Sequence, residues 1–360
     1  MMKACEKLLR TLNFEKMSDG GAVVETFFPW NLTLDRWCEE GLPKQFHANK
    51  LFPAPENLKH LCLYDCMAMP VYEYEQYLGL DGVKRIAFRI PLKSFGDTQP
   101  VIRNMEEWHT LKSKVIGELE KYCTDDNIKE IYGKFKEGHE AGDFSIRFRV
   151  SGFFWTPREL MGIEEHMFAF FDMPEVILDM NQFIVDTYIK YLGKIFDIIK
   201  PEVILLEEDL SGSNGPMLSP ATFDEFVGAY YKKLFTFLKS KGVKNIFVDT
   251  DGDFNKLIPN FIEAGVDGFL PMDVNAGMDI VEVRKKYSKL KFIGAYNKLE
   301  IAKGKEAIDK EFERILPVIR QGGYVPGGDH QVAPSTSFEN YKYYITRLKE
   351  AMLQAGADRS

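Results

Sequence analysis

The sequence predicts an α/β fold, a closed TIM-type barrel of βα units, on three observations. Short apolar segments alternate with amphipathic helical segments through the second half of the chain, a pattern typical of parallel βα folds. About seven or eight such units fit a closed barrel better than an open sheet. No glycine-rich dinucleotide-binding turn follows any of the expected strands, which argues against a Rossmann fold.

The expected strands are short, and several end in acidic or polar residues. They cover residues 23–28, 146–154, 203–207, 245–249, 268–272, 291–295 and 323–326, with a further candidate at 61–64. Between residues 182 and 199, apolar side chains recur with the 3.6-residue period of a helix that buries one face. Ser219 followed by Pro220 predicts the start of another helix, and Gly242 predicts its end.

We expect residues 1–360 to form a single barrel domain, with residues 51–140 as an insertion near the mouth. The segment VYEYEQYLGLDGVKRIAFRIPLKSF predicts a β-hairpin or small sheet, and a long polar helix follows it. Residues 51–95 are expected to cover the mouth as a lid or to form a subunit contact, which are common uses of such segments.

Composition excludes some classes of function. The chain has 45% hydrophobic and 28% charged residues, as soluble globular proteins do, and its formal net charge of −8 argues against nucleic-acid binding. The N-terminal residues lack an apolar stretch of signal-peptide length, and no apolar run is long enough to span a bilayer, so we expect no membrane association and a cytoplasmic location. Five cysteines, the last of them Cys123, lack the spacing of a disulfide framework; Cys62 and Cys66 form only a weak metal-binding pattern.

Acidic and polar residues follow the expected strands at the point where each strand ends. In a βα barrel these ends meet at one mouth, which is where active sites lie. Carboxylates crowded there repel one another unless some are protonated, paired or bound to a cation, while others cap the following helices. His330, in the flexible sequence Gly-Gly-Asp-His, adds a nitrogen ligand suited to zinc. The residues at the strand ends are Glu207, Glu208, Asp209, Asp249, Asp251, Asp253, Asp273, Tyr296, Asn297, Lys298, Asp329 and His330.

Three segments resemble the uroporphyrinogen decarboxylase superfamily: NIFVDTDGDFNKLIPNFIEAGVDGFLPMD, KFIGAYNK and GGYVPGGDHQVAPSTSFENYKYY. The segment DRWCEEGLP, residues 35–43, is similar to a decarboxylase-like bacterial branch of it. The resemblance implies a distorted (β/α)8 barrel and one of two activities. Uroporphyrinogen decarboxylases need no cofactor and bind their polycarboxylate substrate with an N-terminal arginine-rich motif. This chain lacks that motif and keeps Arg36 as the cation there, and an acidic mouth is expected to repel a polyanion.

The second group in the superfamily consists of cobalamin-dependent methyltransferases, which hold zinc through a His-x-Cys pair and a later Cys. Asp249 and Asp251 stand where His-x-Cys is found, and Asp329 and His330 lie near the later Cys position. The resemblance therefore implies an oxygen-rich site in place of a thiolate site. Such a site suits zinc acting as a Lewis acid on a phenolic, ether or amine leaving group.

The leading hypothesis is a corrinoid-linked methyltransferase or demethylase that acts on a small methylated compound, with zinc as a candidate cofactor. Its expected partners are a corrinoid carrier protein that holds cobalamin and a second copy of the chain in a homodimer. The alternatives are decarboxylation of a tetrapyrrole without metal and a catalytically silent corrinoid-binding protein. The candidate catalytic residues are Asp249, Asp251, Tyr296 and His330; the candidate substrate contacts are Trp155, Arg158, Asp273 and Asn297; and the candidate metal ligands are Glu207, Asp251 and His330.

Overall fold

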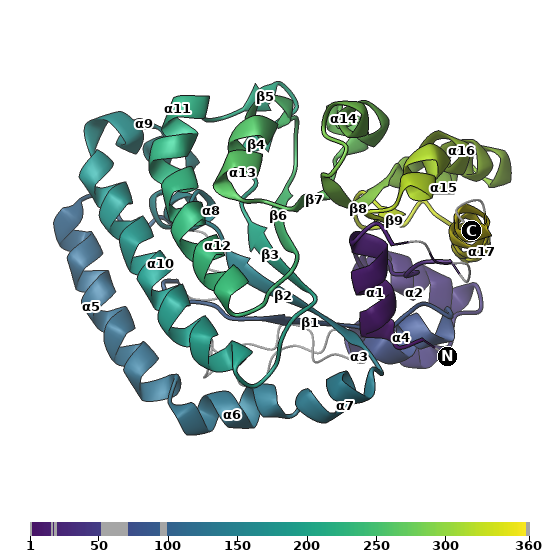
Figure 1. Cartoon of the computed structure of the whole chain (residues 1–360), viewed down its shortest axis with the longest axis horizontal. Helices are drawn as coiled ribbons and strands as arrows, with labels where there is room; N and C mark the ends of the chain where they lie inside the picture. Colours follow the sequence, from purple (N-terminus) through teal and green to yellow (C-terminus); the bar gives the residue numbers. More distant parts are fainter. Residues whose placement is uncertain (1, 16, 18–19, 52–70, 94–98, 358–360) are drawn as a thin grey trace.

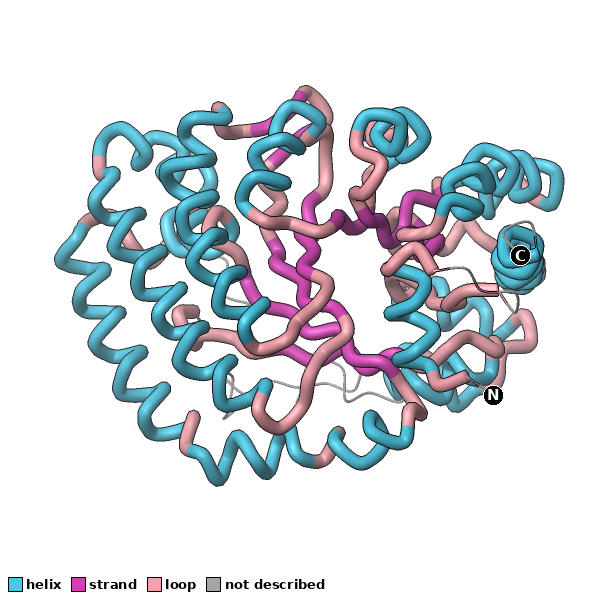
Figure 2. Tube along the Cα trace, in the orientation of Figure 1, coloured by secondary structure: helices cyan, strands magenta, loops and turns pink. Residues whose placement is uncertain are grey.

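The computed structural model describes residues 2–15, 17, 20–51, 71–93 and 99–357. Within them, a curled sheet of seven parallel strands is flanked by helices, which confirms the predicted distorted TIM-type fold (Figures 1 and 2). Each strand pairs in parallel with its neighbour in the order of the chain. The strands are β1 (Val83–Ala87), β2 (Ser145–Ser151), β3 (Val203–Glu207), β6 (Ile246–Thr250), β7 (Gly268–Pro271), β8 (Lys291–Tyr296) and β9 (Tyr324–Gly328).

The first predicted strand, residues 23–28, is wrong as a strand, because the segment is extended but forms no ladder. It nevertheless bridges the two edge strands. The carbonyl of Val23 accepts a hydrogen bond from the backbone N–H of Asp81, next to β1, at 2.8 Å. The carboxylate of Glu25 accepts one from the backbone N–H of Gly328 in β9, also at 2.8 Å. The segment thus occupies the eighth position of the ring through side-chain as well as backbone contacts.

Residues 51–140 do not form a simple insertion. Their described part contains β1, a strand of the main sheet, in place of the predicted hairpin, and the preceding segment is helix α4 (Val71–Tyr77). The predicted long polar helix is present as α5 (Met105–Tyr122), followed by α6 (Asp125–Gly133) and α7 (Lys136–Ala141). The expected lid lies partly outside the described residues, as does the candidate strand at 61–64, so the lid stays a prediction.

The helix predicted from residues 182–199 is part of α10 (Pro174–Phe196), which begins earlier because Pro174 occupies its first turn. The helix predicted after Ser219 is confirmed. The Ser219 hydroxyl accepts the N–H of Thr222 at 3.1 Å, and the run of α11 (Pro220–Phe223), a π-helical turn and α12 (Ala229–Ser240) ends next to Gly242, whose φ is +86°. Helices α5, α10 and α12 lie next to one another, in this order, on one side of the outer surface (Figure 1).

The remaining helices complete the outer layer. None of the helices in the described part of the chain is both long and apolar enough to cross a bilayer. The other helices are α1 (Ala4–Leu12), α2 (Asn31–Glu39), α3 (Ala48–Leu51), α8 (Trp155–Met161), α9 (Ile163–Asp172), α13 (Ile258–Ala264), α14 (Ile280–Lys286), α15 (Lys298–Ala302), α16 (Lys305–Gln321) and α17 (Phe338–Ala357), and a short hairpin is formed by β4 (Ser211–Gly212) and β5 (Gly215–Pro216).

The inside of the curled sheet has an apolar floor. Helix α1 covers the amino-terminal ends of the strands, where the carbonyl of Thr11 accepts the N–H of Gly323 at 2.9 Å, just before β9. Every second side chain of each strand faces inward. These inward side chains are apolar near the floor and polar near the carboxyl ends, where the active site of a barrel lies. The floor cluster comprises Leu8, Leu12, Ala22, Val24, Val83, Val203, Leu205, Phe247, Leu270, Ile293 and Val325.

Candidate active site

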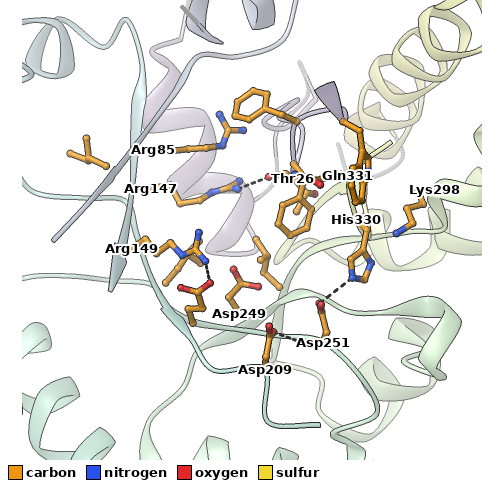
Figure 3. A pocket seen from close by; sticks show the side chains of 17 residues that line it. Thr26, Arg85, Arg147, Arg149, Asp209, Asp249, Asp251, Lys298, His330 and Gln331 are labelled. Atoms are coloured by element: carbon orange, nitrogen blue, oxygen red, sulfur yellow. Dashed lines mark hydrogen bonds and ion pairs between the residues drawn. The ribbon is translucent and has the colours of Figure 1, made fainter. Parts of the chain in front are cut away.

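A cavity of about 330 Å³ opens inside the curled sheet, between the floor and the carboxyl ends of the strands. Its volume is at the lower end of the range for small-molecule sites. Its lining is both apolar and strongly charged (Figure 3). The apolar lining residues are Phe27, Phe28, Trp30, Ile86, Leu205 and Leu270; the polar ones are Thr26, Arg85, Arg147, Arg149, Glu207, Asp209, Asp249, Asp251, Lys298, His330 and Gln331.

Three arginines form one wall of this cavity, and the sequence reading missed them. Arg85 is on β1, and Arg147 and Arg149 are on β2, with Arg85 the register partner of Arg147. In β2 they alternate with Ile146 and Phe148, which are fully buried. In a closed barrel both faces of a strand are covered, so the polar residues of such an alternating strand must face the interior. That alternation was the signal that could have found them.

The arginines correct the expectation that an acidic mouth repels anions. The cations come from β1 and β2, whereas the acids Glu207, Asp209, Asp249 and Asp251 come from the ends of β3 and β6 (Figure 3). The charges of the two walls therefore offset each other, and the cavity as a whole presents no acidic barrier.

Asp249 carries the most perturbed carboxyl group of the cavity. It is the last inward-facing residue of β6 and meets solvent only through the cavity. Burial raises the pKa of Asp249 to about 7; Arg149 opposes this shift, and the charges of Asp209 and Asp251 add to it. A carboxyl group that changes protonation near neutral pH suits general acid–base catalysis.

Asp251 and His330 form a pair across the mouth. The Nε2 atom of His330 lies 3.2 Å from a carboxylate oxygen of Asp251. Burial lowers the pKa of His330, but the hydrogen bond and the charge of Asp251 outweigh it, so the pKa is raised above its usual value. The Nδ1 atom of His330 is buried and has no hydrogen-bond partner in the described part of the chain. The ring stacks beside Phe27, with centroids 6.2 Å apart.

The structure brings three of the four residues expected to share one pocket, Asp249, Asp251 and His330, to the cavity lining. Asp273, the fourth, lies beside the cavity and is not part of its lining. Its carboxylate accepts the N–H of Ala276 at 3.2 Å and so caps the turn after β7.

Four other candidates point away from the cavity. The hydroxyl of Tyr296 donates to the carbonyl of Ile308 at 3.2 Å, because this side chain faces the outer helices. Asn297 caps α15. Arg158 stacks over the ring of Trp155 at 4.2 Å and donates to the carbonyl of Asp209 at 2.7 Å. Sequence distance from a strand end could not show which side of the sheet these residues face.

Some strand-end acids only cap neighbouring elements, as expected. Glu208 is fully buried, and its carboxylate accepts the N–H groups of Phe153, Phe154 and Trp155 at 2.8–3.0 Å and the hydroxyl of Tyr231 at 2.6 Å. It fixes the chain at the start of α8 and does not line the cavity.

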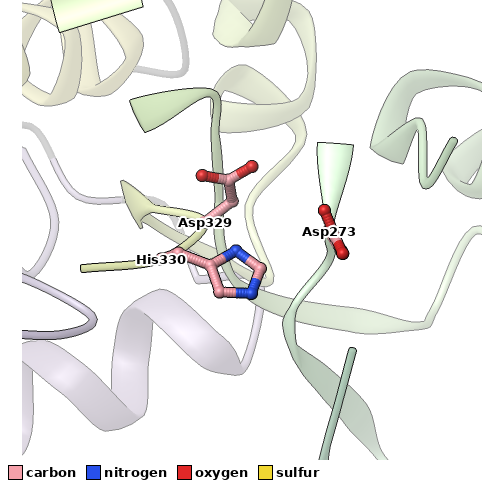
Figure 4. Close-up of side chains that lie close together, drawn as sticks. All are labelled: Asp273, Asp329 and His330. Atoms are coloured by element: carbon pink, nitrogen blue, oxygen red, sulfur yellow. The ribbon is translucent and has the colours of Figure 1, made fainter. Parts of the chain in front are cut away.

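The acids that could hold a metal differ from the predicted set. Glu207 forms an ion pair with Arg149, which would compete with a metal for its carboxylate. In the described residues, ligand atoms of Asp273, Asp329 and His330 lie within 4.8 Å of one another (Figure 4). Asp329 is fully buried; one carboxylate oxygen accepts the N–H of Lys298 at 3.0 Å, and the other accepts the N–H of Val274 at 3.3 Å and the side-chain amide of Asn275 at 3.4 Å. A carboxylate has about four acceptor positions, so one remains for a metal.

Comparisons with known proteins agree with this architecture. The family model described as uroporphyrinogen decarboxylase (URO-D) matches residues 151–351, more than half of the chain. A methyltransferase from Methanosarcina mazei has a similar fold, with a TM-score of 0.64 at 14% identity over 97% of this chain and 99% of its own. A protein described as a vitamin-B12-independent methionine synthase from Listeria monocytogenes covers 94% of this chain and 97% of its own at 10% identity, but its TM-score of 0.39 supports no inference. No curated protein matches the sequence.

Proposed function

Since this chain belongs to the uroporphyrinogen decarboxylase (URO-D) family, we propose that it is a methyltransferase that acts on a small methylated compound bound in the central cavity. The observation that carries the proposal is Asp249, a carboxyl group with a pKa near 7 beside the Asp251–His330 pair in a closed-bottomed cavity. The fold shared over nearly the whole length with a methyltransferase supports it.

The cavity residues can supply the proton that methyl transfer requires. When the bond between the methyl carbon and the oxygen or nitrogen of the substrate breaks, the electron pair stays on that heteroatom, and the methyl group passes to an acceptor nucleophile. Protonated Asp249 would give its proton to the heteroatom and become a carboxylate that Arg149 stabilises. Asp251, whose side chain is exposed at the mouth, would restore this proton from solvent.

We propose that the acceptor is cobalamin held by a carrier protein, which would supply the nucleophile. Trp30, which lines the cavity and is 54% exposed, supports this proposal. An exposed tryptophan at a cavity entrance offers an apolar surface for the large ring of cobalamin to pack against.

Zinc is a further part of the proposal, because the side chains gathered near His330 are of the types that bind zinc. Two carboxylates and the unpartnered Nδ1 atom of His330 make three oxygen and nitrogen ligands, which leaves a fourth position open, as catalytic zinc sites require. The ligands would be Asp273, Asp329 and His330. Bound zinc would act as a Lewis acid that polarises the substrate heteroatom.

The test is an anaerobic assay in which the purified chain, with zinc, receives reduced free cobalamin and a panel of methyl ethers and methylated amines. Methylcobalamin formation is followed by absorbance. Asp249→Asn is expected to lower the rate by roughly 10²–10⁴-fold. Asp253→Asn is the matched control, because Asp253 lies four residues further along the chain, in the loop after β6, and its carboxylate bonds Asn255 outside the cavity. Equal rates for the two variants would contradict the role of Asp249, and no turnover at all would favour the catalytically silent alternative.

Decarboxylation is the second candidate, and the three arginines favour it, because they could hold carboxylates of a substrate in the cavity. Anaerobic conversion of uroporphyrinogen to coproporphyrinogen would establish this activity.

A further inference from the structure

Arg147 is a buried cation without a counterion. Its side chain lines the cavity, yet the residue is only 5% exposed. Its guanidinium donates to the backbone carbonyl of Thr26 at 3.0 Å, and its Nε atom is buried with no hydrogen-bond partner in the described part of the chain. No carboxylate of the described residues lies within ion-pair distance of it. A buried charge in this state is costly unless a ligand pairs with it.

The two neighbouring arginines differ from Arg147 in this respect. Arg85 forms an ion pair with Glu75 at 2.7 Å, and Arg149 forms one with Glu207. Burial and the positive charge of Arg85 lower the pKa of Arg147 to about 9, while the charges of Glu75, Asp249 and Glu25 oppose this shift without forming an ion pair with Arg147. Arg147 is therefore the arginine of this wall that a ligand carboxylate could pair with directly.

We propose that the substrate of this site is a small monocarboxylate whose carboxylate group pairs with Arg147. This inference rests on the proposed function and names its substrate class. One guanidinium without an ion pair, in a cavity whose other cations are balanced by acids, matches a monoanion better than a phosphate dianion. The planar fork of a guanidinium matches the two oxygens of a carboxylate.

The strand register gives the substrate an orientation. Arg147 lies opposite Val203, whereas Ser151, four residues further along β2, lies opposite Glu207, which is itself opposite Asp249. Four residues of a strand span about 13 Å, and the arginine side chain covers part of this length. The carboxylate would therefore lie at the closed end of the cavity and the methyl-bearing group near Asp249.

The apolar lining suits the body of such a molecule. Phe27, Phe28, Leu205 and Leu270 line the space between the arginine wall and the acids. A ring carrying a carboxylate at one end and a methyl ether or methylamine at the other would fill it, with its charge at Arg147 and its reacting atom near Asp249.

Binding measurements on the full chain test this inference apart from turnover. Calorimetry would compare matched pairs of carboxylates and neutral amides, such as 4-methoxybenzoate and 4-methoxybenzamide, with 4-methoxybenzenesulfonate as a second monoanion. The wild type is expected to prefer a carboxylate over its amide by at least about tenfold. Arg147→Met should abolish the preference, and Arg147→Gln serves as a second variant if the first does not fold. Arg103→Met is the control: the Arg103 side chain is 76% exposed, so this variant should keep the preference for a carboxylate over its amide.

The inference would be overturned if both Arg147→Met and Arg147→Gln kept the preference for a carboxylate over its amide. It would also be overturned if the wild type showed this preference in no ligand pair. Sulfonate binding as tight as carboxylate binding would overturn its restriction to carboxylates. Carboxylate binding without methyl transfer would contradict the proposed function but support the binding site. Methyl transfer from neutral compounds alone would support the proposed function but contradict the carboxylate site.

Discussion

Glu207 of β3 and Asp249 of β6 are register partners on adjacent strands, and both line the cavity, but Arg149 forms its ion pair with Glu207. This division leaves Asp249 without the direct ion pair that Glu207 has. Glu207 has a cation within hydrogen-bond reach, whereas Asp249 feels the same cation only at longer range and keeps its proton to near neutral pH.

The first prediction concerns the pH dependence of stability. Asp249 holds its proton to about pH 7 in the folded chain, against an ordinary value of 3.8, so its contribution to stability is full below pH 4 and is lost as the pH rises through 7. The wild type should therefore lose this stability from pH 4 to pH 8, whereas Asp249→Asn should not. The unfolding free energy of the variant minus that of the wild type should rise by about 2–4 kcal/mol from pH 4 to pH 8. Denaturant unfolding at both pH values measures this. A difference that does not change with pH would contradict the raised pKa.

The second prediction concerns Arg149 and its two acidic neighbours. Glu207→Gln removes the ion-pair partner of Arg149, so the cation becomes available to Asp249 and the pKa of Asp249 should fall by roughly one unit. A carbon-13 NMR titration of labelled aspartate carboxyls, assigned with Asp249→Asn, measures it. Glu263→Gln is the control, because it breaks the exposed pair with Lys232 far from the cavity. A pKa that rises in Glu207→Gln would show that the two carboxyls do not share Arg149.

The third prediction concerns metal binding. If zinc binds at Asp273, Asp329 and His330, then His330→Ala should weaken zinc binding at least 100-fold, and Asp251→Asn about 10-fold, because Asp251 orients the imidazole. Glu207→Gln should leave zinc affinity unchanged, since Glu207 is paired with Arg149. Equilibrium dialysis against zinc followed by elemental analysis gives the affinities. Loss of zinc in Glu207→Gln would instead support Glu207, Asp251 and His330, the ligands expected from the sequence.

The fourth prediction separates a structural acid from the cavity acids. Glu208→Ala should lower the unfolding free energy by about 2–5 kcal/mol, because three backbone N–H groups and the Tyr231 hydroxyl lose their acceptor inside the protein. Burial raises the pKa of Glu208, and Glu208→Gln, which keeps one acceptor oxygen, should lose less stability. Thermal unfolding measures both variants. Equal stability of Glu208→Ala and the wild type would show that this network does not hold α8.

The fifth prediction concerns the family's decarboxylation. We expect no efficient conversion of uroporphyrinogen, because the chain lacks the N-terminal arginine-rich motif and the cavity of about 330 Å³ suits a smaller molecule. The anaerobic assay described above, with the wild-type chain and a decarboxylase as positive control, measures it. Efficient formation of coproporphyrinogen would contradict both the size argument and the methyltransferase proposal.

The sequence by itself determined the architecture and the place of the site. Residues 203–207 and 245–249 were predicted as strands within one residue of β3 and β6, because apolar runs between helical periods are local signals. The acids after them were expected at one mouth, because the carboxyl ends of parallel strands share one edge. For Asp249, Asp251 and His330, that reasoning was sufficient to bring them to one cavity.

Only the tertiary structure decided which side chains face that cavity and which ones pair. Tyr296 ends β8 and Asn297 follows it, as Asp251 follows β6, yet neither lines the cavity: the Tyr296 hydroxyl bonds the carbonyl of Ile308, and Asn297 caps α15. Arg147 lies more than a hundred residues from Asp249 in sequence, and its lack of a counterion follows from the register of β1, β2 and β3. Charge pairing is set by distances of a few ångströms between strands, and such distances exist only once the sheet has closed around its interior.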